Sequence, residues 1–547
     1  MTYALARRRL LPKWRRISST LSMPEAQPEA RSGVRPIALD NSDLDRTIDA
    51  WRKNPTSGHL GDVLSFAVST ENIDSVRGVL RTALDQGADL STAQRKFAED
   101  ILGARSRNEA VSGVLNSAKY LEERTRQVKL LFSSDPGNPL VLLDMAQLRL
   151  AQGDVKKSER LLRSAKQISP NDRLVLRITS RFLTHVSRAD EAHHLLATHA
   201  RTAIDPWLMA SEIALSQVIG KSSKFLKIGQ RIIKEKSRSS ASTTELAAAL
   251  AGVELASGNY KRAREYYRGA LLAPNDNVMA QVVTDQRILS LDASSSILQS
   301  GGTNPYEAKA LISWRNVDYA GAFEAGVSWH AEEPYSSRPL QFLTSFLSSS
   351  ANYEDAIMLA RRGLIADPED VGLEVNLAYA LAATGDLKNA ERLAKKAKLS
   401  DPLKFAAQAT ATLGLVAMKR GDFVRADECY MSALETFSKN NDNALYSICQ
   451  AYYARTAFDC GHERVGEIID AAVEGYRKTP VPDSAFILKG LGADISRESQ
   501  RADGVKRVIQ WEFDAEKAEL IKRNVLVDVD APIIINRSKK QGSESSL

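Results

Sequence analysis

The sequence is poor in the residues that mark secreted, metal-binding or membrane-spanning proteins. It holds three cysteines in 547 residues. Cys429, Cys449 and Cys460 form neither a Cys-x-x-Cys pair nor a spacing suited to metal ligands. We therefore expect small core residues in a reducing compartment. No run of about 18 apolar residues occurs, so the sequence predicts no membrane-spanning helix.

Sequence motifs of catalysis are also missing. There is no GxxxxGK[ST] phosphate loop, no GxGxxG after a strand and no GxSxG turn. Four of the seven histidines cluster at His185, His193, His194 and His199. None of them falls in an HExxH motif, and His194 and His199 are five residues apart, so the cluster does not favour zinc binding. We expect no catalytic residue, no metal and no cofactor.

Aromatic residues make up only 6 % of the chain, whereas hydrophobic residues make up 43 %. That apolar content is enough for a folded protein, and much of it is alanine, which suits helices that pack closely. The chain is too long for one ordinary core. Several domains or a repeat architecture are therefore expected.

One pattern occurs twice between Gly372 and Phe437. Each copy has an apolar run of helical spacing, a Gly-Asp pair and a second helical run. Glycine favours the left-handed end of a helix, and aspartate caps the start of the next one. The copies align at 36 residues: Gly385 with Gly421, Ala390 with Ala426, and Ala397 with Ala433. A period of this size predicts stacked helix pairs, or a solenoid.

The second copy, from Ala407 to Ser438, resembles the tetratricopeptide repeat (TPR) family. Leu413 and Gly414 occupy the positions of that family's Leu-Gly pair. The characteristic small and aromatic residues of its second helix are matched by Ala426, Tyr430 and Ala433. The family's tryptophan is absent, and Ser438 replaces its terminal proline. The resemblance implies a non-catalytic scaffold or adaptor that binds a partner segment in the concave groove of a superhelix.

The same period extends through most of the chain. Residues 139–170 and 243–274 carry the landmarks, and Ala322, Ala356, Ala390 and Ala426 follow one another at 34, 34 and 36 residues. We therefore predict an all-α, TPR-like solenoid of antiparallel helix hairpins followed by a short extended segment. The predicted divisions are a basic, disordered tail and linker (1–43), an N-terminal repeat block (44–292), a C-terminal TPR block (303–484), capping helices (485–524) and an extended segment with a disordered tail (525–547).

Positive charge is concentrated at the N-terminus. Eight Lys/Arg against two Glu in residues 1–39 account for six of the seven net positive charges. The candidate membrane-binding or targeting residues are Arg7, Arg8, Arg9, Lys13, Arg15 and Arg16. They are compatible with a mitochondrial transit peptide, an interfacial segment on anionic lipid, or a disordered tail. Pro12 counts against a helix here. The expected location is the cytoplasm, peripherally at a membrane, or the mitochondrial matrix in a eukaryote.

Two further sets of residues are candidates for partner binding. The first is a basic stripe at helical spacing, formed by Lys224, Lys227, Arg231, Lys234 and Arg238. It is either a solvated outer face or a site for an acidic protein segment, anionic lipid or phosphate backbone. The second lies on the expected inner face of the repeats and comprises Tyr379, Leu415, Met418 and Lys419. These positions suit an amphipathic or extended partner segment.

Three functions follow from these features. The first is a protein–protein interaction scaffold with a protein partner. The second is a membrane-surface assembly factor for secretion or polysaccharide export, docked by its basic N-terminus. The third is a helical-repeat RNA-binding protein, which the near-neutral solenoid disfavours. Residues 524–535 form a predicted strand that packs along the last helices or adds to a partner's sheet.

Overall fold

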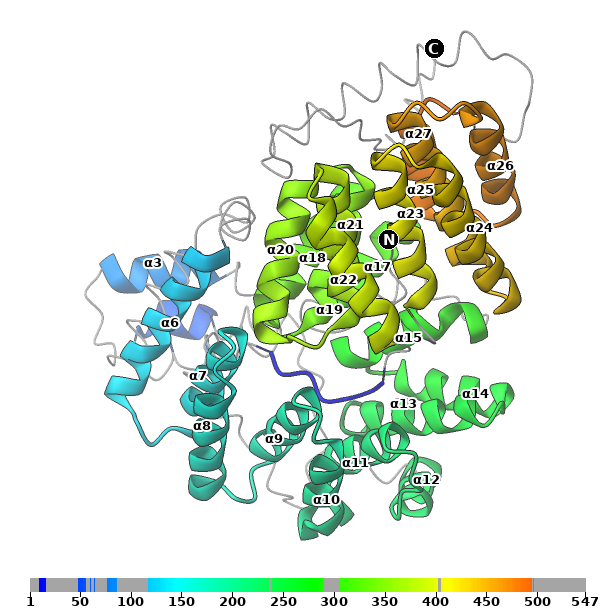
Figure 1. Ribbon diagram of the computed structural model, residues 1–547. Helices are drawn as coiled ribbons and strands as arrows, with labels where there is room; N and C mark the ends of the chain where they lie inside the picture. Colours follow the sequence, from blue (N-terminus) through cyan, green and yellow to red (C-terminus); the bar gives the residue numbers. More distant parts are fainter. Residues whose placement is uncertain are drawn as a thin grey trace, which may run out of the picture.

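The protein is an all-α solenoid of antiparallel helix pairs (Figure 1). A computed structural model describes residues 9–15, 48–55, 60, 63, 76–85, 117–235, 239–289, 305–401, 405–493 and 495. Every regular element in those ranges is helical. None of the helices found there is long and apolar enough to span a membrane.

The helices form two successive coils. The N-terminal coil contains α6 (Ser117–Ser134), α7 (Pro139–Ala151), α8 (Val155–Ile168), α9 (Arg173–His185), α10 (Ala189–Thr198), the short η2 (Ala200–Ala203), α11 (Pro206–Val218), α12 (Leu226–Glu235), α13 (Ser240–Ala256), α14 (Tyr260–Ala270) and α15 (Asp276–Leu289). Helix α3 (Arg77–Asp85) precedes them.

The C-terminal coil contains α17 (Tyr306–Arg315), α18 (Tyr319–Glu332), α19 (Ser337–Ser349), α20 (Tyr353–Ala366), α21 (Val371–Thr384), α22 (Leu387–Ser400), α23 (Ala406–Lys419), α24 (Phe423–Lys439), α25 (Asn443–Asp459), α26 (Val465–Lys478) and α27 (Pro482–Gly490). One continuous hydrophobic core runs through it, while two other cores run through the N-terminal coil.

The Gly-Asp pairs end one helix and begin the next, as predicted. Gly385 ends α21 in the left-handed conformation with a φ of 98°, which costs a glycine little. Asp386 then accepts a hydrogen bond from the backbone N–H of Asn389 in α22. Gly153 and Asp154 repeat this arrangement between α7 and α8. The breaks thus specify where each hairpin turns.

The small residues of the repeat lie where neighbouring helices meet. Ala390, Ala397, Ala426 and Ala433 are fully buried. A Cβ atom on Gly414 would lie 2.9 Å from the ring of Tyr430, so α23 and α24 approach too closely for a larger residue. The TPR-like helical repeat predicted from these landmarks is present.

The C-terminal coil closes on itself and fills its own interior. The indole Nε1 of Trp314 in α17 donates to Asp483 Oδ2 in α27 at 3.1 Å. In the interior, the buried Arg455 donates to the carbonyls of Ser348 and Ser349 and to Tyr379 Oη, each at 2.8 Å. The coil's own side chains therefore fill its concave side.

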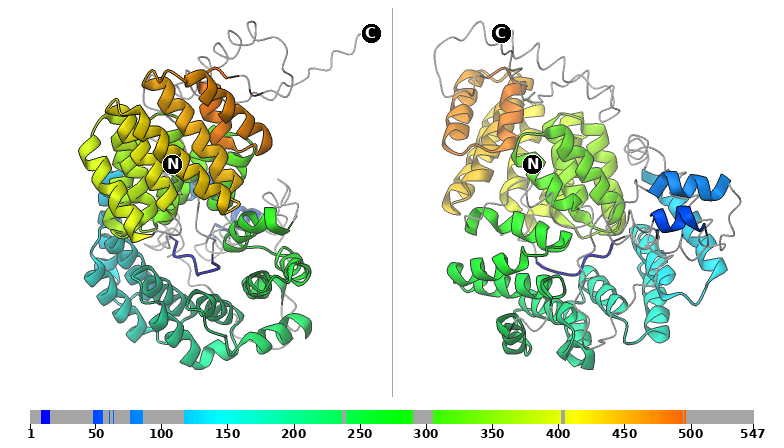
Figure 2. Two further views of the ribbon diagram at one scale, coloured as in Figure 1. Left: turned by 45° about the vertical axis from the view of Figure 1, so that its right-hand side comes forward. Right: turned by 180° about the vertical axis from the view of Figure 1, so that it is seen from behind.

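The N-terminal coil curls back against the C-terminal one. Arg124 of α6 donates to the carbonyl of Ala331 in α18 at 3.1 Å. His185 Nε2 at the end of α9 lies 3.1 Å from the carbonyl oxygen of Ala366 in α20. Residues 9–15 lie between the arc of N-terminal helices and the block that begins with α17 (Figure 2, dark blue). The interior of the N-terminal coil thus contains a piece of the chain's own N-terminal region.

Candidate peptide-binding site

The extended segment Arg9–Arg15, named here the internal segment, runs through the N-terminal coil without forming a helix. Side-chain amides contact its backbone at two points. Asn277 Nδ2 in α15 donates to the Leu11 carbonyl at 3.1 Å, and Gln147 Nε2 in α7 donates to the Trp14 carbonyl. Both amide side chains are buried. Bonds of this kind recognise an extended backbone whatever its side chains are.

The two amides are themselves held in place by charged residues. Arg124 donates to Gln147 Oε1 at 2.8 Å, which directs the Gln147 NH₂ group toward the internal segment. Asn277 Nδ2 also donates to Glu245 Oε1 at 3.1 Å. Glu245 in turn accepts from Arg177 at 2.5 Å. The donors are therefore oriented by the helices around them.

Trp14 is the apolar anchor of the internal segment. It is fully buried, and its ring centroid lies 5.0 Å from that of Tyr335. His185 meets Tyr335 edge-on at 5.3 Å, and the Arg181 guanidinium lies 5.5 Å from the Tyr335 ring centroid. Burial and the nearby Arg181 lower the pKa of His185 to about 4. The surroundings of Trp14 thus include a neutral histidine at pH 7.

The two leucines pack deeper in the same coil. Leu10 is 4 % exposed and belongs to the core formed with α11 and α13. Beside it lies a small hollow lined by Arg9, Gln217, Ala248, Ala249, Gly252 and Gln281. Leu11 is half-buried and contacts both N-terminal cores.

Lys13 and Arg15 are both paired with carboxylates of the groove. Lys13 Nζ lies 3.2 Å from Glu307 Oε2, and Glu307 is almost fully buried. Arg15 pairs with Asp276, and its Nε lies 3.5 Å from Glu332 Oε2. Burial lowers the pKa of Arg15, but Asp276, Glu332 and the adjacent Glu333 outweigh it, so its pKa is raised. The carboxylates of the groove therefore lie opposite the cations of the internal segment.

Three of the six predicted membrane-binding or targeting residues fall in the described part of the chain. Arg9, Lys13 and Arg15 lie in the internal segment, and their membrane or targeting role stays a prediction. Arg7, Arg8 and Arg16 lie outside the described residues. The contacts join residues 133 to 266 positions apart, so no local pattern indicates them. Pro12 and Trp14 were the available signals, since proline favours extended chain and tryptophan seeks burial.

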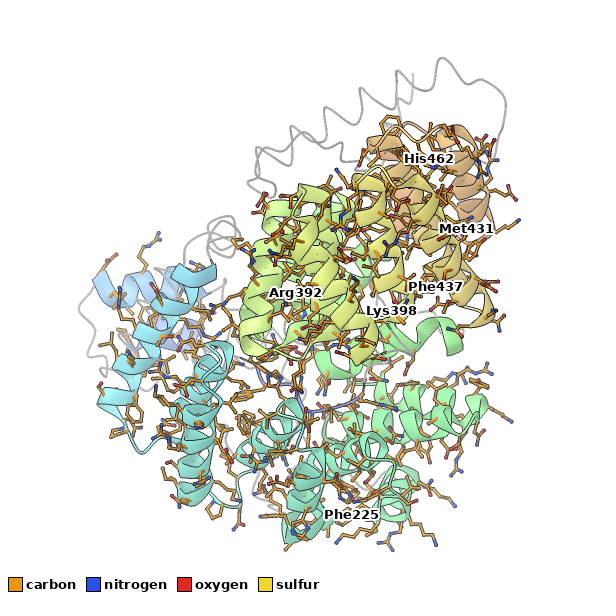
Figure 3. All side chains as sticks on the ribbon, in the orientation of Figure 1. Phe225, Arg392, Lys398, Met431, Phe437 and His462 are labelled. Atoms are coloured by element: carbon orange, nitrogen blue, oxygen red, sulfur yellow. The ribbon has the colours of Figure 1, made fainter. Side chains whose placement is uncertain are left out.

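The basic stripe lies on α12 and the turn before it. Lys224, Lys227, Arg231 and Lys234 are exposed, and Arg238 lies outside the described residues. The other side of the helix packs inward through the buried Phe225 (labelled in Figure 3). Lys224 Nζ lies 5.1 Å from the Phe225 ring centroid, and Arg231 lies 4.0 Å from Glu235. The common face is as predicted, and its binding role stays a prediction.

The predicted inner-face residues of the C-terminal coil are not open to a partner. Tyr379, Leu415 and Met418 are at most 3 % exposed and belong to the hydrophobic core. Only Lys419 among the four is exposed. The expectation of an open groove at these three positions is wrong. Helical spacing identifies an apolar face but does not distinguish a core contact from a groove contact.

Metal-binding side chains do not gather into a site in the described part of the chain. Over those residues, no group of three or more His, Cys, Asp or Glu side chains could hold a metal ion. Cys449 is buried, and burial raises its pKa well above the usual thiol range. Cys429 and Cys460 are half-buried, and burial raises their pKa as well.

Comparison with known proteins adds only weak structural similarity. No protein-family description matches the chain, and no curated protein matches it. Among solved structures, the crystal structure of yeast Tom70 aligns at 13 % identity over 83 % of this chain and 97 % of that one, with a TM-score of 0.31. A TM-score this low does not establish that the two proteins share a fold. The chain is therefore described by its own architecture, a solenoid of helix pairs that encloses a segment from its own N-terminal region.

Proposed function

We propose that this protein is a non-catalytic interaction scaffold that holds an extended segment of a partner protein in the groove between its N-terminal coil and the first helices of its C-terminal coil. The observation that carries the proposal is the placement of the internal segment. Its backbone meets two oriented amide donors, its tryptophan is fully buried, and its Lys13 and Arg15 face carboxylates. These are the features by which proteins recognise extended peptides.

The C-terminal coil does not offer the same site. Arg455 and its tyrosine neighbours occupy its interior, and Arg455 is itself buried. A partner segment would have to displace a buried cation from three hydrogen bonds, which is costly. The groove between the two coils already holds the internal segment, so it is the favoured binding region.

Electrostatics favours a protein partner over nucleic acid or anionic lipid at this site. The groove presents Asp276, Glu307 and Glu332 to the internal segment, and these carboxylates would repel phosphate groups. While the internal segment is bound, Lys13 and Arg15 face these carboxylates and not a membrane surface. The exposed stripe on α12 stays a separate candidate for anionic partners.

A binding measurement tests the proposal. The probe is a fluorescent peptide of residues 8–16 (RRLLPKWRR). The receptor is the full chain with its own segment weakened by Trp14→Ala and Arg15→Glu. We expect a rise in anisotropy with the probe and none with a scrambled peptide of the same composition. Adding Asp276→Lys and Glu332→Lys to the receptor should abolish the rise.

The matched control is Glu435→Lys, a charge reversal at an exposed side chain of α24 that pairs with Lys439 along the same helix. It should leave binding unchanged. Circular dichroism melts confirm that each receptor is folded. Equal binding of the scrambled peptide, or no binding by a folded receptor, would overturn the proposal.

A further inference from the structure

The internal segment has the features of a ligand that the coil can release and replace. We propose that Arg9–Arg15 is an exchangeable internal ligand, and that the partner segment carries the same pattern: two adjacent leucines, then an aromatic residue between two cations. This inference rests on the proposed function. It adds the chemistry of the partner and a self-occluded state of the free protein.

The connection to the rest of the chain allows exchange. Residues 16–47 separate the internal segment from the next described residue, Ile48. At ~3.3 Å per residue, 32 residues reach roughly 100 Å when extended. This length is enough for the segment to reach outside the groove while Ile48 stays in place.

The walls of the groove are joined to each other independently of the segment. Arg124 links α6 to the end of α18, and His185 links α9 to α20. Arg177 of α9 pairs with Glu245 of α13 at 2.5 Å. Arg315 of α17 donates to the Val283 carbonyl of α15 at 2.6 Å. These contacts would keep the site shaped after the segment leaves.

The charges of the groove favour a basic segment as the replacement for the internal segment. Without the segment, Asp276, Glu307 and Glu332 would line a partly buried channel with fewer cations beside them. Glu307 would keep Arg338, whose Nη2 lies 2.9 Å from its other oxygen. Unpaired carboxylates in such a channel are unfavourable. A replacement with two suitably placed cations would therefore be preferred over a neutral one.

The spacing of the cations supplies specificity. In an extended chain, residues i and i+2 point to the same side and residue i+1 to the other. Lys13 and Arg15 accordingly meet carboxylates from α15, α17 and α18, whereas Trp14 packs on Tyr335. A partner needs the order cation, aromatic, cation. Two adjacent cations would place one of them against the Tyr335 ring.

Tethering makes the internal segment a strong competitor. A segment tethered to its site through a stretch of this length has an effective concentration on the order of millimolar. For a segment with an intrinsic Kd of ~10 μM, self-occlusion would weaken a partner's apparent affinity about 100-fold. The wild-type chain should therefore bind the partner segment weakly until its own segment is weakened.

The test compares full-length receptors that differ only in the internal segment. Labelled RRLLPKWRR is titrated into wild type, Arg15→Glu and the milder Lys13→Ala, each checked for folding by circular dichroism. We expect Arg15→Glu to bind at least 10-fold tighter than wild type, with Lys13→Ala between them. A probe with the tryptophan and the lysine exchanged (RRLLPWKRR) should bind at least 10-fold more weakly to every receptor.

The outcomes separate this inference from the proposed function. Equal affinity for wild type and Arg15→Glu overturns exchange but leaves a peptide-binding scaffold. Binding by none of the folded receptors overturns both. Equal affinity of the two probes overturns the spacing rule. A concentration-dependent dimer of wild type that Arg15→Glu abolishes would mean that the segment occupies a second copy, which also overturns exchange within one chain.

Discussion

At the scale of single residues, Trp14 shows how a contact remote in sequence can dominate a site. Its burial against Tyr335 removes a large aromatic surface from water. Arg455 makes the same point in the other coil, where it lies 4.8 Å from the Tyr452 ring centroid and bonds two carbonyls. Trp14 anchors the internal segment, and Arg455 fills the interior of the C-terminal coil.

Replacing Trp14 tests how much this side chain contributes to the free energy of unfolding. If the internal segment acts as a tethered ligand at 100 to 1,000 times its Kd, it contributes about 3–4 kcal/mol. We expect Trp14→Ala to lower the free energy of unfolding by about that amount in urea denaturation. The control, Phe458→Ala, removes a side chain that is 55 % exposed and should change it by less than about 0.5 kcal/mol.

Addition of the free RRLLPKWRR peptide should restore part of the stability lost in Trp14→Ala, because ligand binding stabilises the folded state by mass action. A loss that saturating peptide does not reduce would indicate a permanent core residue and not a replaceable one.

At the scale of helices, small residues at the crossing points determine how closely two helices of a pair approach. Gly414 in α23 faces Tyr430 and the Ala426 carbonyl of α24. Gly466 in α26 has open space where its Cβ would be. The two glycines have the same helical backbone but opposite surroundings, so they form a matched pair.

Alanine substitutions at these glycines should have opposite signs. Gly414→Ala places a methyl 2.9 Å from a ring carbon of Tyr430, and such overpacking typically costs about 1–3 kcal/mol. Gly466→Ala restores helix propensity at no steric cost and should stabilise by about 0.5–1 kcal/mol. Thermal melts of both variants check the prediction, and two shifts of the same sign would contradict it.

At the scale of the whole molecule, closure of the C-terminal coil depends on a buried acid. Asp483 of α27 accepts from Trp314 of α17, which joins the last described helix to the first of this coil. Burial raises the pKa of Asp483 to about 6, although the Trp314 hydrogen bond opposes the shift. The folded chain therefore binds this proton more tightly than the unfolded chain does.

The sign of the pH effect follows directly. Protonated Asp483 adds roughly 3 kcal/mol to the free energy of unfolding. This contribution is complete below about pH 4 and is lost as the pH rises through about 6. Asp483→Asn keeps a neutral acceptor, so it should be less stable than or equal to wild type at pH 4 and gain relative to it by pH 7.

Comparing wild type with Asp483→Asn isolates the effect of the Asp483 proton on stability. Asp367 has a pKa raised to about 6 by burial and Asp370, and burial lowers the pKa of His185 to about 4. Both groups are present in wild type and variant, so their effects cancel in the difference. A difference in urea-unfolding free energy that stays constant from pH 4 to 7 would contradict the prediction.

The sequence by itself determined the repeat. Glycine at the turns, aspartate at the caps and alanine at the crossings act within one or two helices, so their consequences can be deduced from local spacing. Gly385, Asp386 and Ala390 lie where that spacing places them. The exposed face of α12 follows for the same reason.

The location of the candidate binding site depends on the tertiary structure. Whether an apolar helix face meets a partner or its own core depends on how far the coil curls, a sum over many small inter-helix rotations. That curl buries Tyr379 and brings Glu307 beside Lys13 and Asp276 beside Arg15. Lys13 and Arg15, which local sequence patterns place in a tail, thereby lie in a groove assembled from helices more than a hundred residues away.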